Sequence, residues 1–325
     1  MKAIIPVAGA GTRLRPHTHS TPKVLIPVAG KPIIGHILNQ LQGLPIDEVI
    51  LVIGHMGDKI REYVEGNFKF KTTFVTQEKA KGLADAIYLT KQTVGNDDAI
   101  IILGDTIFKT SFKDIISKPN SQIGVKPVAD PRRFGVVEQD GKKITRLVEK
   151  PEHPKTNLAI VGIYLIRKMP RLYAAIDQLY QKKIRTKGEY QLTDALQLML
   201  EQGEVMESFT VDGWYDCGKP ETLLETNRQL LEMSSLHPTP RQGVVINPPV
   251  YIDPGAKLEH CIIGPYVSIA AGSSIKNSII SNTIIGSNVQ IETMMLQNSI
   301  LGDNATVRGK QRRLNVGDGS EIDLT

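Results

Sequence analysis

The sequence predicts an α/β fold in two parts, a doubly wound, mostly parallel mixed sheet followed by a C-terminal parallel β-helix of hexapeptide repeats. Two observations carry this prediction. Over the first two thirds of the 325 residues, short aliphatic runs alternate with longer amphipathic stretches, as in strands joined by crossover helices. Beyond residue 250, aliphatic residues recur about every six positions, which fits the short strands of a coil and not the roughly 3.6-residue period of a helix.

The first part is expected over residues 1–236, a linker over 237–250, and the β-helix over 251–325. The expected strands are Lys2–Val7, Glu48–Ile53, Thr72–Thr76, Ala99–Leu103 and Ile123–Pro127. The expected helices lie between them, at Pro32–Leu41, Met56–Val64 and Leu83–Thr90. Ligands of such sheets bind at the carboxyl ends of the strands, so a site is expected in the loops after Val7 and Leu103.

Composition narrows the class of protein. The net charge of +5 suits an enzyme that handles anionic phosphates. A nucleic-acid-binding protein would be expected to have a basic stretch interleaved with aromatic residues, and this sequence has none. Cys217 and Cys261 are the only cysteines and fit neither a disulfide framework nor a metal cluster. No aliphatic run is long enough to span a membrane. We therefore expect a cytoplasmic protein with neither a nucleic-acid nor a membrane partner.

A glycine-rich loop from Ala8 to Pro16 follows the first strand. Its glycines let backbone N–H groups face a triphosphate without obstruction by a Cβ atom. A dinucleotide fingerprint would need a third glycine where Leu14 stands, and a P-loop would close on Gly-Lys-Ser/Thr, so neither motif is met. A plain glycine turn stays open for the loop alone, but Lys23, ten residues past Arg13, adds a second cation nearby.

Together these motifs resemble the sugar nucleotidylyltransferases, specifically the glucose-1-phosphate thymidylyltransferase and uridylyltransferase group. The resemblance extends from the N-terminus to about residue 230 and rests on Gly11 to Leu14, Pro22-Lys23, and Pro27-Val28 with Lys31-Pro32. It implies a Rossmann-like nucleotidyltransferase domain followed by a left-handed β-helix. The implied substrates are a nucleoside triphosphate, dTTP or UTP, and a sugar 1-phosphate.

The resemblance also implies how the nucleotide is held. Gln77 and Gly82 would read the pyrimidine base, which needs an amide donor and acceptor pair and a close backbone approach. The remaining implied nucleotide contacts are Val7, Ala8, Gly9, Ala10, Gly11, Thr12, Arg13, Lys23 and Asp105.

Two separated carboxylates are the candidate metal ligands. Asp105 ends a buried aliphatic strand, where an unpaired charge is costly unless a cation meets it. Asp216, within Trp214 to Gly218, matches the second metal carboxylate of the family, although alone it could be a turn residue. Mg²⁺, which is held by one or two carboxylates and substrate phosphates, is the expected cofactor.

The sugar contacts implied by the resemblance lie between these carboxylates. Glu149 would accept hydrogen bonds from sugar hydroxyls, and Lys150 would pair with the sugar phosphate. In isolation this pair could equally be a solvated ion pair at a strand end. The other implied sugar-phosphate contacts are Gly135, Val161, Gly162 and Glu189, whereas Asp194 is interpreted as a helix cap.

The implied reaction is attack by a sugar 1-phosphate oxygen on the α-phosphorus of the triphosphate, with Arg13, Lys23, Asp105 and Lys150 as catalytic residues. Because the nucleophile is already ionised, no general base is required. Two other functions stay open. A non-catalytic regulatory relative would lack the metal carboxylates or the loop cations, and an acyltransferase β-helix would need a histidine base in its coils, where only His260 lies. We expect the β-helix to serve homo-oligomer contacts.

Overall fold

A computed structural model describes residues 1–234 and 239–310 of the chain, which separates into two compact units. The first unit comprises Met1–Ile26 and Lys31–Thr226, and the second comprises Pro27–Gly30 and Asn227–Thr325. The expected boundary at residue 236 and the last part of the expected β-helix, residues 311–325, lie outside the described residues.

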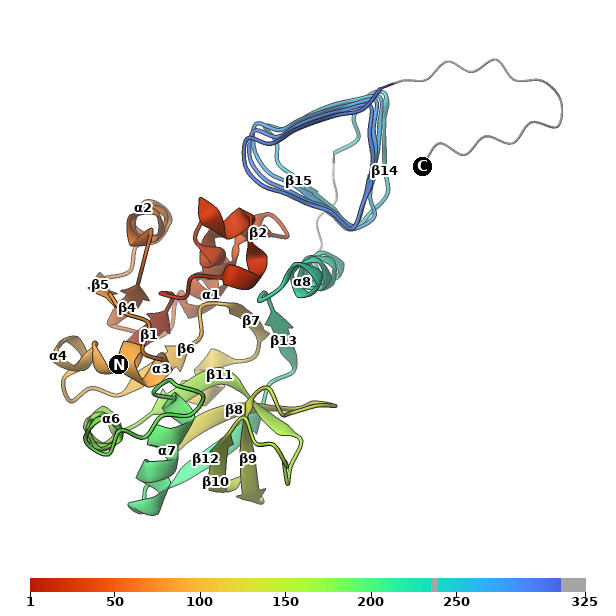
Figure 1. Cartoon of the computed structure of the whole chain (residues 1–325). Helices are drawn as coiled ribbons and strands as arrows, with labels where there is room; N and C mark the ends of the chain where they lie inside the picture. Colours follow the sequence, from red (N-terminus) through yellow and green to blue (C-terminus); the bar gives the residue numbers. More distant parts are fainter. Residues whose placement is uncertain (235–238, 311–325) are drawn as a thin grey trace. The chain divides into compact units, whose positions relative to one another are not determined.

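A mixed sheet forms the centre of the first unit, in the order β5-β4-β1-β6-β11-β8-β12-β10-β9 (Figure 1). All five strands expected from the sequence belong to it, and β4 and β5 have the expected bounds. The strands are β1 Lys2–Pro6, β4 Glu48–Ile53, β5 Thr72–Thr76, β6 Ala99–Ile102, β8 Ser121–Pro127, β9 Gly135–Asp140, β10 Lys143–Glu149, β11 Leu158–Ile166 and β12 Met206–Thr210.

The parallel arrangement is concentrated in the first half of this sheet. Strands β5, β4, β1 and β6 run parallel, and Ile4 of β1 lies opposite Ile50 of β4 and Ile101 of β6. All three isoleucines are fully buried, which agrees with the continuous aliphatic runs of β1, β4 and β6. Strand β11 runs antiparallel to both β6 and β8, while β12 runs parallel to β8. The predicted α/β fold class is confirmed.

The helices of the first unit include the three that the sequence predicts, at α1, α2 and α3. Helix α1 buries Ile33, Ile34, Ile37, Leu38 and Leu41, a spacing that forms one apolar stripe. No helix in residues 1–234 and 239–310 is long and apolar enough to cross a membrane. The helices are α1 Ile33–Leu41, α2 Gly57–Asn67, α3 Leu83–Tyr88, α4 Lys91–Val94, α5 Phe112–Ile116, α6 Met169–Gln181, α7 Leu192–Glu201 and α8 Pro220–Met233.

Three parallel sheets of very short strands form most of the second unit and enclose a triangular outline (Figure 1). Each strand pairs with the equivalent strand of the next coil, so that Val244 lies opposite Cys261 and Gln290 lies opposite Thr306. One coil therefore has three sides of five to six residues each, consistent with the predicted left-handed β-helix. The sheets are β14-β17-β20-β23 (Val244–Ile246, Cys261–Ile263, Ile279–Ser281, Met295–Gln297), β15-β18-β21-β24 (Val250–Ile252, Val267–Ile269, Ile284–Ile285, Ile300–Leu301) and β16-β19-β22-β25 (Lys257–Glu259, Ser274–Lys276, Gln290–Glu292, Thr306–Arg308).

Several bends of the coil contain residues with positive φ, and asparagine is the most frequent of them. Asparagine tolerates the left-handed conformation better than other residues with a Cβ atom. Stacked asparagines also bond to one another, since Nδ2 of Asn282 donates to Oδ1 of Asn298 at 2.7 Å. The asparagines with positive φ in the coil are Asn277, Asn282, Asn288, Asn298 and Asn304.

Asn227, in the second half of α8, connects the turn Pro27–Gly30 to the β-helix within the second unit. Its Oδ1 accepts hydrogen bonds from the N–H of Ala29 at 2.8 Å and from the hydroxyl of Ser268 at 2.6 Å. Its Nδ2 donates to the carbonyl of Tyr266 at 3.2 Å. Asn227 is fully buried, so each of these bonds replaces contact with water.

Candidate active site

A cavity of about 540 Å³ opens beyond the carboxyl ends of β1, β5 and β6. This size is within the usual range for small-molecule sites. Glu189, expected at the sugar, lines it as well, whereas Ala10 of the glycine loop does not. The expected nucleotide contacts that line it are Val7, Ala8, Gly9, Gly11, Thr12, Arg13, Lys23, Gln77, Gly82 and Asp105.

Glycine stands at positions 9 and 11 of the loop for different structural reasons. Gly11 has φ +59°, and a Cβ on it would come within 3.0 Å of side-chain carbons of Lys23 and Thr18. The hydroxyl of Thr18 donates to the Gly11 carbonyl at 2.9 Å, which holds this close approach. A Cβ on Gly9 would meet nothing within 4 Å. Gly11 is therefore required by packing. Gly9 lines the cavity, and its missing side chain leaves space there.

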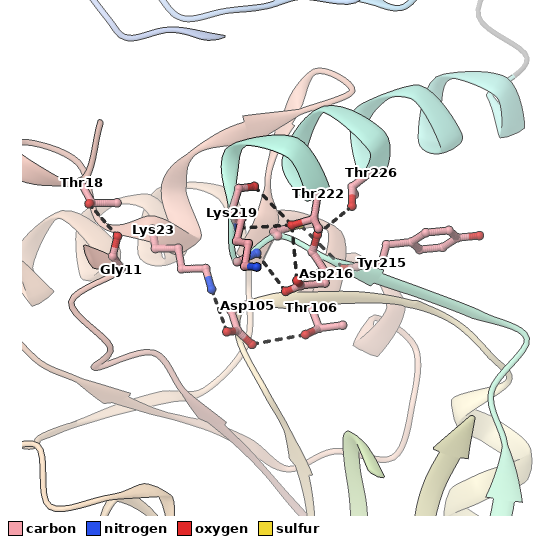
Figure 2. A network of polar contacts seen from close by, with 12 residues as sticks. Gly11, Thr18, Lys23, Asp105, Thr106, Tyr215, Asp216, Lys219, Thr222 and Thr226 are labelled. Carbon is pink, nitrogen blue, oxygen red and sulfur yellow. Dashed lines mark hydrogen bonds and ion pairs between the residues drawn. The ribbon is translucent and has the colours of Figure 1, made fainter. Parts of the chain in front are cut away.

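Lys23 and Asp105 form an ion pair at the cavity (Figure 2). Lys23 lies on a 3-10 helix, Lys23–Leu25, and Asp105 follows β6; Nζ and Oδ2 are 2.7 Å apart. Partial burial raises the pKa of Asp105, but the charge and hydrogen bond of Lys23, together with the hydrogen bond from Thr106, hold the pKa below its usual value. Asp105 is therefore a carboxylate, as a metal ligand must be.

Asp216 lies beside Asp105 because two short strands pair. Strand β13 (Gly213–Asp216) runs antiparallel to β7 (Thr106–Lys109), with Asp216 opposite Thr106. The N–H of Cys217 also donates to the Asp105 carbonyl at 3.2 Å. The structure thus brings both expected metal carboxylates together, although they lie far apart in the sequence.

Gly218, just before α8, and the first turns of α8 hold Asp216 in place (Figure 2). Its Oδ1 accepts from the N–H of Gly218 at 2.9 Å, and its Oδ2 accepts from the hydroxyl of Thr222 at 3.3 Å. The hydroxyl of Thr226 donates to its carbonyl at 3.1 Å. The sequence prediction did not include these threonines, although their positions four residues apart on one helix face were a usable signal.

Arg13 approaches the same place. A Cβ on Gly218 would be 2.9 Å from Nη2 of Arg13 and 2.8 Å from Oδ1 of Asp216. Gly218 therefore lets the guanidinium and the carboxylate come close, at a residue that also lines the cavity. Lys23 and Arg13 together place two cations there, as the sequence predicts.

The end of the cavity where the sequence predicts the base is built from two hydrogen-bonded segments. The N–H of Tyr190 donates to the Lys81 carbonyl at 2.9 Å, and the N–H of Ala84 donates to the Tyr190 carbonyl at 3.0 Å. Gly82 lies between these bonds with φ +119°, and a Cβ on it would be 2.4 Å from the Tyr190 carbonyl oxygen. Only glycine fits there, so the backbone of residue 82 can line the cavity.

Glu149 and Lys150 lie at the end of β10, next to the expected sugar contact Gly135. The hydroxyl of Thr193 donates to Oε2 of Glu149 at 2.6 Å, and Nζ of Lys150 is 3.3 Å from Oε1. A Cβ on Gly135 would come within 2.8 Å of the Thr193 hydroxyl and 3.0 Å of Oε2. Gly135 is therefore needed for the bond between Thr193 and Glu149.

Lys150 also lines a second cavity, of about 450 Å³. Four cations and the single carboxylate of Glu152 surround this space, which makes it attractive to anions. The sequence prediction did not include Arg132 and Lys187, although Arg132 stands shortly before Gly135 and Lys187 shortly before Glu189, both of which it included. The residues lining the cavity are Arg132, Arg133, Lys150, Pro151, Glu152 and Lys187.

Val161 and Gly162, also expected at the sugar, lie in an irregular part of β11 and line neither cavity described above. Gly162 has φ +99°, and a Cβ on it would be 2.6 Å from Cδ1 of Leu103. Its carbonyl accepts from the N–H of Leu103 at 2.9 Å. The close packing of Leu103 is thus sufficient to explain this glycine.

The match to known proteins agrees with this geometry. A family model described as nucleotidyl transferase matches residues 2–233, which include every residue of both cavities. The chain belongs to the nucleotidyl transferase family. The resemblance to sugar nucleotidylyltransferases is thereby confirmed, and the protein is an enzyme of this family.

Individual relatives of this nucleotidyl transferase extend over both units. The low-salt glycan biosynthesis nucleotidyltransferase Agl11 of Haloferax volcanii is 33% identical, with 100% of both chains covered. The glucose-1-phosphate thymidylyltransferase of Streptomyces griseus is 32% identical, with 96% of this chain and 90% of the relative covered. A solved structure from Bacillus anthracis superposes with a TM-score of 0.63. It contains a protein provisionally assigned as a glucose-1-phosphate thymidylyltransferase, in complex with a sucrose. It is 32% identical and covers 73% of this chain and 98% of its own.

Proposed function

We propose that this nucleotidyl transferase converts dTTP and glucose 1-phosphate into dTDP-glucose and pyrophosphate. The observation that carries the proposal is a single cavity lined by the glycine loop, by Lys23 and Arg13, and by Gln77 and Gly82 at the base end. The thymidylyltransferase of Streptomyces griseus, which covers nearly the whole chain, supports dTTP and glucose 1-phosphate. UTP is the alternative triphosphate, because uracil and thymine differ only by one methyl group.

In the proposed reaction an oxygen of the sugar 1-phosphate attacks the α-phosphorus in line, and the bond to pyrophosphate breaks. Lys23 and Arg13 would bind the triphosphate, and Lys150 would bind the sugar phosphate. The protein brings two anions together and neutralises charge that builds on the α-phosphate and on pyrophosphate. No proton has to be moved at the attacking oxygen.

Magnesium is the proposed cofactor, and Asp105 and Asp216 would hold it. Asp216 pairs with Thr106 in the β7 and β13 ribbon, and Asp105 directly precedes Thr106. The part of the chain that the structure describes has no group of three or more His, Cys, Asp or Glu side chains that could hold a metal. This donor set suits an ion that takes one or two carboxylates and completes its shell with phosphate oxygens and water. When bound, the ion would supply positive charge between the phosphates.

The decisive experiment measures pyrophosphate release for a panel of triphosphates, each with glucose 1-phosphate and other sugar 1-phosphates. We expect dTTP with glucose 1-phosphate to have the highest kcat/KM, and Asp216→Asn to raise the magnesium concentration needed for half-maximal rate. Pyrophosphate release that is absent from every pairing would refute the proposal. Nucleotide binding without release would favour the regulatory alternative.

We also propose that the chain self-associates through the sheet β14-β17-β20-β23. One column of paired residues on it is apolar and exposed: Val245 by 55%, Ile262 by 38%, Ile279 by 43% and Met295 by 78%. The strands of this sheet contain no charged residue, whereas the sheet β16-β19-β22-β25 has ion pairs between coils. An exposed apolar patch of this kind favours contact with a matching surface, here that of a second copy.

Light scattering tests this contact. Met295→Glu should shift the mass toward the monomer, while Gln290→Glu, which adds the same charge to the ion-paired sheet, should not. A wild-type chain that is monomeric at micromolar concentration would contradict the proposal.

A further inference from the structure

The orientation of the Gln77 amide is determined by its partners. Nε2 of Gln77 donates to Oδ2 of Asp85 at 2.8 Å and to the carbonyl of Gly82 at 3.3 Å. A carboxylate and a carbonyl can only accept, so the NH₂ group must face them. Gln77 lines the cavity of about 540 Å³, and its Oε1 accepts no hydrogen bond from the described part of the chain.

Asp85 itself is held so that it cannot turn away. It is 7% exposed, and its second oxygen, Oδ1, accepts from the hydroxyl of Tyr180 at 2.8 Å. The ring of Tyr180 packs edge-on against Tyr88 and Tyr190, with centroids 5.2 and 4.7 Å away. Burial, and next the hydrogen bond to Asp85, raise the pKa of Tyr180 far above its usual value, so this phenol remains a donor.

We propose that Asp85 is a positioning residue that holds the oxygen of the Gln77 amide toward the nucleotide, so that the site selects bases with a ring N–H donor. Uracil and thymine present N3–H, and guanine presents N1–H. Cytosine and adenine present a lone pair at the equivalent nitrogen, which would face the lone pairs of Oε1. The inference rests on the proposed function, because that function places the base against Gln77.

The test is base selectivity, measured as the ratio of kcat/KM for UTP to that for CTP. In Asp85→Asn the new side chain can donate as well as accept, so the Gln77 amide can turn over and offer its NH₂ group to cytosine. We expect the ratio to fall by about 10- to 100-fold, the usual effect of one mismatched hydrogen bond in a buried site. A role in folding alone would lower kcat/KM for both triphosphates equally and leave the ratio unchanged.

Asp177→Asn is the matched control. Asp177 accepts from the hydroxyl of Tyr88 at 2.6 Å, in the same aromatic cluster, and no hydrogen bond joins it to Gln77. We expect this variant to keep the wild-type ratio. An unchanged ratio in Asp85→Asn with a wild-type melting temperature would overturn the proposal, as would an equal fall in the control.

Calorimetric binding to the wild-type chain gives a readout that needs neither turnover nor a variant. UTP should bind at least about 10-fold more tightly than CTP and than 3-methyluridine triphosphate, which lacks the N3–H. Equal binding of the three would overturn the inference, even if Asp85→Asn failed to fold. If UTP binds selectively but no pairing releases pyrophosphate, the proposed reaction fails, and the UTP-to-CTP binding ratio of Asp85→Asn, expected to fall by about 10- to 100-fold, tests the role of Asp85 instead.

Discussion

Replacing Lys23 by methionine tests the triphosphate contact most directly. Methionine keeps the apolar part of this nearly buried side chain and removes only the ammonium, which is 2.7 Å from Asp105. Loss of one preorganised cation at the phosphates should lower kcat by about 10² to 10³, or roughly 3 to 4 kcal/mol. Stability should change much less. The Asp105 side chain is 42% exposed, so water can replace the ammonium, and we expect a cost of at most about 1 kcal/mol.

The assay is pyrophosphate release from dTTP and glucose 1-phosphate, with thermal unfolding of the same samples. Lys59→Met is the matched control, because Nζ of Lys59 also makes a short bond, to the Ser20 carbonyl at 2.6 Å, but Lys59 does not line the cavity. The control should keep wild-type turnover. A folded Lys23→Met enzyme within threefold of wild type would show that the ion pair at Asp105 is structural and would refute the assignment.

Two further predictions concern stability. Burial raises the pKa of Glu48, but the hydrogen bond from Lys2 at 2.6 Å helps to hold this pKa below 4.5. The ionised Glu48 carboxylate therefore stabilises the folded protein above pH 4.5, and this contribution is lost as the pH falls through the lowered pKa. Glu48→Gln should therefore lower the free energy of unfolding by about 1 to 3 kcal/mol at pH 7, and urea titrations should show the difference shrinking in acid. Gly162→Ala should cost about 1 to 3 kcal/mol more than Gly141→Ala in the same titrations, because only the first methyl group would collide with Leu103; equal losses would contradict the packing argument.

Local patterns in the sequence predict the parallel strands well. Strands β4 and β5 begin and end where expected, because an aliphatic run or an alternation of β-branched residues is bounded by polar residues. The position of β11 between β6 and β8 depends on tertiary pairing, and nothing within Leu158–Ile166 specifies an antiparallel partner. The period of the β-helix is readable because each coil repeats the same environment.

Some residues of the candidate site can likewise be predicted from local sequence, and others depend on tertiary contacts. The glycine loop, Lys23 and Asp105 are recognisable because glycine and charge stand directly after strands. Asp85 is not, because in the sequence it is an acidic residue between two alanines, which is typical of an exposed helix face. Its function depends on Tyr180, 95 residues away, and on the direction of one amide. Such a dependence becomes visible only once the side chains are placed.

Asn227 has a consequence for how such a protein can evolve. The turn Pro27–Gly30 is encoded near the start of the gene and the β-helix near the end, yet both form hydrogen bonds with Asn227. A single recombination event after α8 would keep the turn and Asn227 but replace Ser268 and Tyr266, the partners of Asn227 in the coil. Successful exchange of the C-terminal unit therefore requires either two coordinated replacements or a donor whose coil retains the partners of Asn227.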